Sequence, residues 1–73
     1  MKQWEKKFSA WINTNELIYV ETMKQRIGRS LIYGRLLSFN MDEQFIQLYN
    51  DDDKRVDMIP FKEIDQIGST KER

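Results

Sequence analysis

Three runs of residues decide the fold of this chain: LIYGRLLSFN (31–40), FIQLY (45–49) and VDMIPFKEIDQI (56–67). All three are rich in β-branched and aromatic residues, and polar segments separate them. This pattern predicts consecutive short strands joined by turns, as in a small curled antiparallel sheet. The first run is apolar on both faces, which indicates a strongly bent strand, and Gly34 suits the bend because it carries no side chain.

The residues that precede these runs predict a helix and one further strand. Four apolar residues within 2–13 follow a helical spacing, so this segment is expected to form an amphipathic helix: Trp4, Phe8, Trp11 and Ile12. The run LIYVETM (17–23) is expected to form the first strand. Gly28 can then supply the positive φ of a hairpin turn into the second strand.

The last third of the chain predicts two short strands around a tight turn. Residues 56–59 are expected to form the fourth strand, which Pro60 ends because proline cannot donate to a strand ladder. Residues 61–63 then turn the chain, and residues 64–67 form a brief fifth strand. The polar tail at 69–73 is expected to fray.

The predicted architecture is one domain over residues 1–73 that is mainly β. A helix at about 2–13 precedes a five-stranded, strongly bent antiparallel barrel at about 16–68. Its core is expected to include Trp4, Phe8, Trp11, Ile18, Val20, Leu36, Phe39, Ile46, Leu48, Ile59, Ile64 and Ile67. A barrel of this size is filled by its own side chains, so neither a cofactor nor a small-molecule substrate is expected.

Composition bears on association and on metal binding. The chain has 73 residues with no cysteine and no histidine, so a disulfide and a thiolate metal site are excluded and the commonest zinc ligand is missing. A domain this small has a marginal core, and self-association is a usual remedy. The three aspartates at 51–53 are contiguous and lack a glycine, unlike a calcium loop, so no metal site is expected.

The side-chain inventory also argues against an enzyme and against a membrane protein. Activated nucleophiles and general bases usually involve histidine, cysteine or a phosphate-binding glycine loop, and the sequence offers none of these. It also contains neither a signal-peptide run nor an apolar run near the ~20 residues of a membrane helix. A non-catalytic cytoplasmic protein is therefore expected.

Two resemblances to known families follow from the strand segments. Residues 34–40 resemble the end of the second strand in the Sm-like family of small barrels, including its Hfq-type members, while 44–48 and 61–64 are similar to that family's next strand and its turn into the fifth. This resemblance implies an Sm-like or SH3-like barrel that forms an oligomeric ring and binds single-stranded RNA. Residues 34–67 are also similar to the barrel portion of YolD-like bacterial proteins, which implies protein contacts in a bacterial or phage-like system and no ring.

The candidate binding residues follow these two alternatives. For RNA, the Sm-like resemblance implies base stacking by Phe45 and phosphate or base contacts by Lys62, and other basic residues could assist: Lys24, Arg26 and Arg29. For protein contacts, the candidates are large apolar residues: Trp4, Phe8, Trp11 and Met58. The helix that carries the tryptophans could instead be a lid on the barrel, or lie on a membrane surface.

The charge of the chain favours protein contacts over RNA binding. The chain carries twelve basic and twelve acidic residues, so its net charge of zero provides no bulk attraction for phosphates. The aspartate loop and Glu63, which follows Lys62 directly, add local repulsion. We therefore expect a protein-interaction or assembly module, with another protein or a second copy as partner, and RNA binding as the alternative.

Overall fold

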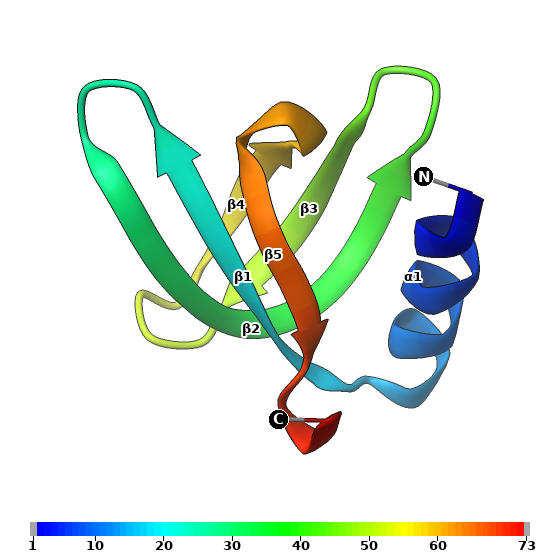
Figure 1. Ribbon diagram of the computed structural model, residues 1–73. Helices are drawn as coiled ribbons and strands as arrows, with labels where there is room; N and C mark the ends of the chain where they lie inside the picture. The colour runs from blue at the N-terminus through cyan, green and yellow to red at the C-terminus, as the bar shows by residue number, and fades with distance from the viewer. Residues whose placement is uncertain (1, 73) are drawn as a thin grey trace.

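The computed structural model describes the backbone of residues 2–72 and the side chains of residues 4–71. Its elements are α1 (Lys2–Thr14), β1 (Leu17–Lys24), β2 (Gly28–Asn40), β3 (Phe45–Asn50), β4 (Arg55–Pro60), η1 (Phe61–Glu63), β5 (Ile64–Ser69) and η2 (Thr70–Glu72). Within the described chain, the five strands form one antiparallel sheet in the order β4-β3-β2-β1-β5 (Figure 1). The structure confirms the mainly β prediction of a helix followed by five antiparallel strands.

The long strand β2 bends sharply and pairs with β1 along its first part and with β3 along its second (Figure 1). Gly34 lies where these two pairings meet, opposite Ile18 of β1 and Asn50 of β3. A Cβ atom at Gly34 would lie only 2.0 Å from the carbonyl oxygen of Tyr49. The predicted role of this glycine is confirmed, since only a residue without a side chain allows the backbones to approach so closely.

A β-bulge interrupts the pairing of β2 with β3. Leu36 pairs with Leu48 and Ser38 with Gln47, so Leu37 is an extra residue in β2. The bulge reverses the alternation of side chains after it. Leu37 is therefore exposed, while Phe39 turns to the inner face, although a regular alternation would put both on the same face.

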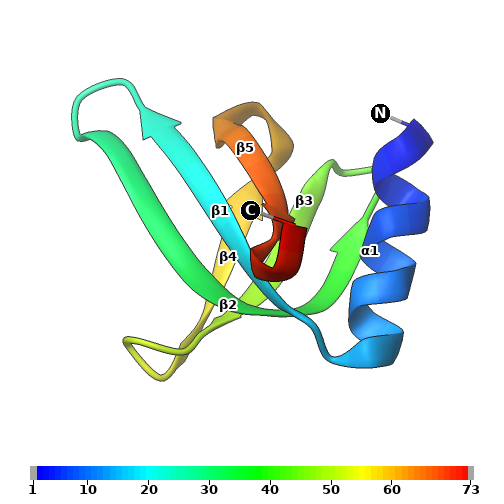
Figure 2. The same ribbon diagram turned by 60° about the horizontal axis from the view of Figure 1, so that its bottom comes forward.

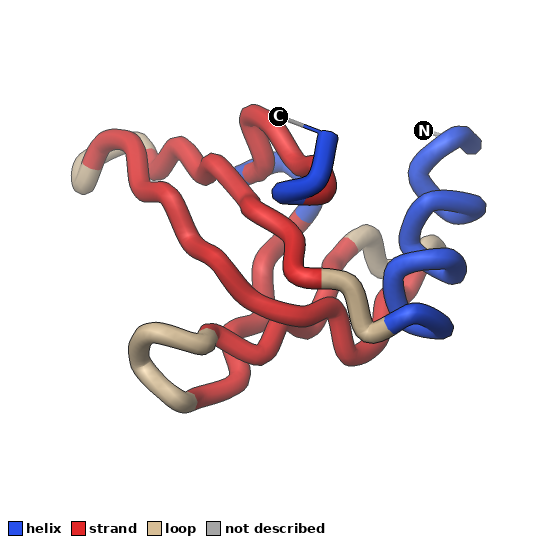
Figure 3. Tube along the Cα trace, turned by 90° about the horizontal axis from the view of Figure 1, so that it is seen from below, coloured by secondary structure: helices blue, strands red, loops and turns tan. Residues whose placement is uncertain are grey.

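The core lies on the inner face of the sheet, and α1 covers one end of it (Figures 2 and 3). Phe8 is fully buried, with its ring centroid 5.3 Å from that of Phe39 and 5.9 Å from that of Trp11. Eight of the twelve residues predicted for the core are buried, and the other four are partly buried and pack against them: Trp4, Phe39, Ile64 and Ile67. The sequence prediction missed Phe61, which was assigned to a turn. The short helix η1 directs this ring inward, 5.3 Å from Trp4.

Two of the positive-φ positions are occupied by residue types that favour this geometry, whereas Gln44 and Lys54 adopt it with φ values of 61° and 56°. Gly28 has a φ of 91°, as predicted for the first hairpin, and Asn15 ends the helix region with a φ of 53°. Strand β2 begins at Gly28, earlier than the predicted residue 31. The β1–β2 hairpin therefore extends beyond the rest of the sheet (Figure 1).

The end of the chain is held against the start of β1, whereas the sequence predicted fraying from Ser69 onward. Ser69 belongs to β5 and is buried, and its hydroxyl donates a hydrogen bond to Glu16. The hydroxyl of Thr70 donates to the carbonyl oxygen of Leu17 at 3.1 Å. These contacts between residues 53 positions apart fix the tail at least to Thr70, and Arg73 lies outside the described residues.

Candidate interaction surface

Strand β4 is an edge of the sheet. It pairs with β3 on one side, and within residues 2–72 no strand pairs with its other side. Strand β5 forms the opposite edge, and no ladder joins the two edges in the part of the chain described. The barrel is therefore open between β4 and β5, and each edge presents backbone groups that another strand could bind.

The hydrogen-bond pattern identifies which backbone groups of β4 point outward. The amide of Phe61 donates to the carbonyl oxygen of Gln44 at 2.8 Å, immediately after the pairing of Pro60 with Phe45. Because bonded and non-bonded pairs alternate in an antiparallel ladder, the residues Asp57 and Ile59 direct their amides and carbonyls toward β3. The amides and carbonyls of the intervening residues, Val56 and Met58, therefore point to the open edge.

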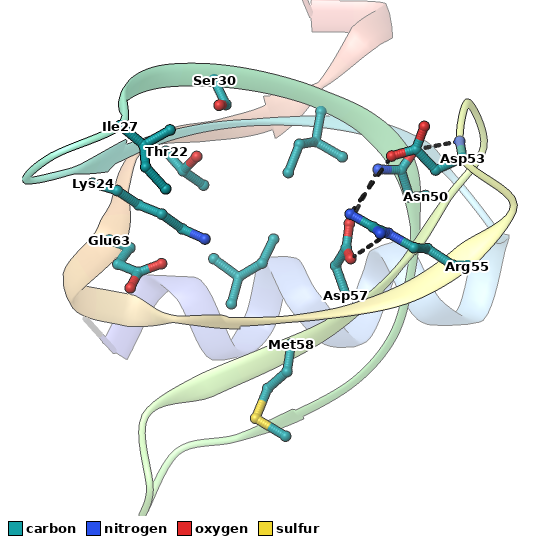
Figure 4. A pocket seen from close by; sticks show the side chains of 12 residues that line it. Thr22, Lys24, Ile27, Ser30, Asn50, Asp53, Arg55, Asp57, Met58 and Glu63 are labelled. Atoms are coloured by element: carbon teal, nitrogen blue, oxygen red, sulfur yellow. Dashed lines mark hydrogen bonds and ion pairs between the residues drawn. The ribbon is translucent and has the colours of Figure 1, made fainter.

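The two residues with outward backbone groups also have exposed apolar side chains. Val56 is 53% exposed and Met58 is 62% exposed. Their side chains lie on the outer face of the sheet, opposite Tyr49 and Gln47 of β3, and Figure 4 shows Met58 pointing away from the barrel interior. A strand added to this edge would thus gain both hydrogen bonds and apolar contacts.

The inner face of β4 carries a network of charged and polar groups. Arg55 lies 3.1 Å from the carboxylate of Asp57 and 3.7 Å from that of Asp53. The amide of Asn50 donates to Asp57 at 3.0 Å, and its side-chain oxygen accepts the backbone amides of Asp52 and Asp53 (Figure 4). Asp53 thus contributes both its carboxylate and its backbone amide to the β3–β4 turn, whereas Asp52 contributes its backbone amide.

The remaining loop aspartate, Asp51, has a different partner. Its carboxylate accepts a hydrogen bond from Arg35 at 2.9 Å, and the same guanidinium donates to the carbonyl oxygen of Asn15 at 3.3 Å. Among the described residues no group of three or more acidic, histidine or cysteine side chains is placed to hold a metal ion. The side chain of Arg35 therefore links the β3–β4 loop to the end of α1.

A hollow of about 270 Å³ opens on the inner side of β4, between this strand and the β1–β2 hairpin (Figure 4). Its lining includes the apolar Ile32 and Ile59, with Lys24 and Glu63 at one end and the Asn50–Arg55–Asp57 group at the other. The volume is just below the roughly 300–1,000 Å³ of most small-molecule sites.

The structure separates the residues predicted for protein contacts. Phe8 and Trp11 are buried in the core, and Trp4 is half-buried with its ring perpendicular to that of Phe61. This burial supports the interpretation of α1 as a lid. Met58 is the predicted contact residue that reaches the surface, and its neighbour Val56 was missed, although the alternation in residues 56–60 could have shown that both share one face.

The residues predicted for RNA are only partly brought together. Lys24 and Lys62 line one shallow hollow, together with Glu63. Arg26 is exposed in the hairpin turn, and Arg29 forms an ion pair with Asp65 at 2.6 Å. Phe45 does not line the hollow; it lies half-buried at the start of β3, opposite Pro60.

Comparison of the chain with protein-family models, with curated proteins and with solved structures gives no match. Among the described residues, no helix has the length and apolar character needed to cross a bilayer. The fold and surface define a small, half-open barrel with a helical lid and an exposed apolar edge strand.

Proposed function

We propose that this protein is a non-catalytic binding module whose partner is another protein, docked by addition of a strand to the β4 edge. The observation that carries the proposal is the combination of outward backbone groups and exposed apolar side chains at Val56 and Met58. Such a module would serve as an assembly component. The resemblance to YolD-like proteins favours a bacterial or phage-like system, and the composition without cysteine favours the cytoplasm.

The energetics of strand addition support this proposal. Natural proteins usually protect an edge strand with lysine, proline or a bulge. In β4, Pro60 lies at the end and the charged Arg55 and Asp57 lie on the inner face, whereas the outer face of the strand carries the apolar Val56 and Met58. Each added backbone hydrogen bond contributes about 1 kcal/mol, and burying the exposed parts of the two apolar side chains contributes about 1 kcal/mol each.

The test compares three single substitutions in pull-downs from the source cell. Val56→Lys and Met58→Lys place a charge on the docking edge. Leu37→Lys is the control, because Leu37 is 48% exposed and lies in the bulge of β2, away from that edge. We expect the two β4 variants to lose proteins that the wild type and the Leu37 variant retain. We also expect retention in molar salt, since apolar contacts and backbone hydrogen bonds are weakly screened. Retention of the same partners by both β4 variants would refute the proposal.

Single-stranded RNA is the second candidate partner, in an Sm-like ring. The observation that favours it is the shared hollow of Lys24 and Lys62, where two ammonium groups could bind phosphates. Glu63 lines the same hollow, and the net charge of zero provides no further attraction. These two features are why we place RNA second.

Titration of labelled uridine-rich and adenine-rich oligomers at low and moderate salt decides between the partners. Lys62→Ala is compared with Lys54→Ala, which removes an exposed lysine from the β3–β4 turn, outside that hollow. We expect no submicromolar binding by the wild type. Submicromolar binding that is lost in the Lys62 variant and kept in the Lys54 variant would establish RNA as the preferred partner.

A further inference from the structure

We infer that the strand which docks on β4 is β4 of a second copy of this chain, antiparallel and related by a twofold axis at Val56. This inference rests on the proposed function and specifies the partner and the pairing register. Two properties of β4 determine this pairing. The backbone groups of Val56 and Met58 point outward, and the side chains of Arg55 and Asp57 share the inner face.

Pairing geometry permits few registers. In an antiparallel pair, residues directly opposite each other project to the same face of the sheet. Two identical copies of β4 (Arg55–Pro60) can meet this condition with the twofold axis at residue 56, which pairs residues 55–57, at residue 57, which pairs residues 55–59, or at residue 58, which pairs residues 56–60. The identities of the opposed residues discriminate among these three.

Two of the registers oppose unfavourable residues. An axis at Met58 places Val56 opposite Pro60 of the second copy, and because proline has no amide, one hydrogen bond is lost on each side of the axis. An axis at Asp57 places this carboxylate directly opposite Asp57 of the second copy. Like charges at directly opposed positions are destabilising.

The register with the axis at Val56 opposes complementary residues over the part of β4 that it pairs, residues 55–57. Val56 faces Val56 of the second copy, and their outward amides and carbonyls form the bonded pair at the centre. Arg55 faces Asp57 of the second copy, and symmetry repeats this ion pair on the other side. These flanking positions are non-bonded pairs, in which opposed side chains approach most closely. Pro60 lies outside the paired segment.

The existing contacts show that the charged groups are available for this exchange. Arg55 already reaches Asp57 of its own chain at 3.1 Å, so both side chains lie along the same face, and the side chain of Arg55 is 66% exposed. The guanidinium can therefore also contact a carboxylate on an adjacent strand.

The resulting assembly is a closed dimer with one sheet continuous across both copies. The contact is isologous, since the same edge is used by both partners, and it leaves no further β4 edge available. Because the paired segment is only residues 55–57 of each copy, the interface is smaller than the 1,200–2,000 Å² of a stable complex. We therefore expect a dissociation constant on the order of micromolar.

The experiment uses charge reversal in two separate variants of the full chain. Arg55→Asp and Asp57→Arg each place like charges opposite one another in their own dimer, so we expect each variant alone to associate at least tenfold more weakly than the wild type in sedimentation equilibrium. An equimolar mixture restores two ion pairs between unlike copies, so we expect a heterodimer near wild-type affinity. An effect confined to ion pairs within one chain could not produce recovery on mixing.

Two controls show whether a variant loses dimerisation because it fails to fold, or because a charge reversal anywhere on the surface has this effect. Circular dichroism and thermal unfolding must show that both variants fold, since Asp57→Arg also loses the hydrogen bond from Asn50. Arg29→Asp reverses a charge of the same kind in the ion pair with Asp65, away from β4. We expect this variant to dimerise like the wild type.

Several results would overturn the inference. A wild-type chain that is monomeric at high micromolar concentration would refute the dimer. This result would leave open the docking of a different protein on β4, which the Val56→Lys and Met58→Lys pull-downs test. Failure of the mixed variants to associate would refute the register. Rings or growing polymers would show that β4 pairs with another edge, and binding of RNA to such a ring would favour the alternative partner.

Discussion

Replacing Gly34 with alanine perturbs the point where β2 passes closest to β3. The added Cβ atom would lie 2.0 Å from the carbonyl oxygen of Tyr49, 2.9 Å from its carbonyl carbon and 3.3 Å from the Cα atom of Asn50. These three atoms belong to the backbone, so no rotation of a side chain can relieve the contact. The strands would have to separate by about 1 Å to reach the closest distances that Cβ atoms normally adopt.

The expected cost of this substitution is large relative to the stability of the domain. Overpacking in a well-packed region costs about 1–3 kcal/mol and more where the backbone must shift, so we expect about 3 kcal/mol or more for Gly34→Ala. Loss of unfolded-state entropy offsets only about 0.4–1 kcal/mol. At about 0.05–0.15 kcal/mol per residue, a chain of 73 residues has a free energy of unfolding of roughly 4–11 kcal/mol.

Urea denaturation followed by tryptophan fluorescence measures this cost, because Trp11 is buried and Trp4 is half-buried in the folded state. Gly28→Ala is the matched control. Its φ of 91° is unfavourable for alanine by about 1–2 kcal/mol, but no atom lies within 4 Å of the added Cβ. If Gly34→Ala is no more destabilising than Gly28→Ala, the close approach of the strands does not constrain this position and the reasoning is refuted.

Three further predictions concern the core, an ion pair and a turn. Phe8→Ala removes a fully buried ring and should lower the free energy of unfolding by about 3–5 kcal/mol in the same denaturation assay; a loss below 1 kcal/mol would contradict the lid interpretation of α1. Arg35→Ala should cost at most about 1 kcal/mol in thermal unfolding, and less at high salt, because both it and Asp51 are about one-third exposed. Asn50→Ala should cost about 1–3 kcal/mol, because its side chain joins the β3–β4 turn to Asp57, and hydrogen exchange should become faster at the turn amides while β1 stays protected. Unchanged exchange there would show that the turn holds without this side chain.

The sequence was sufficient for the helix, the strand order along the chain and most of the core because these follow from local periodicity. The spacing of Trp4, Phe8 and Trp11 places them on one helical face whatever the helix packs against. Gly28 and Gly34 were correctly assigned because a positive φ and a close backbone approach are both demands that glycine meets best.

Features that depend on contacts between distant segments could not be predicted in this way. The burial of Phe61 depends on the rings of Trp4 and Phe8 on α1, and the order at Ser69 depends on Glu16. The exposure of Val56 follows from its position on an edge strand, and strand order within a sheet is not encoded in the local pattern. The candidate binding surface was therefore only half predicted, through Met58.

Deletion of Leu37 would remove the β-bulge from β2. The residues on either side, Leu36 and Ser38, face Leu48 and Gln47, which are adjacent in β3. Loss of a single codon, that of Leu37, would leave every cross-strand pair in place and restore regular alternation to β2. The change would remove the local bend that the bulge introduces into β2. One three-nucleotide deletion could thus straighten β2 without changing which of its residues face the core.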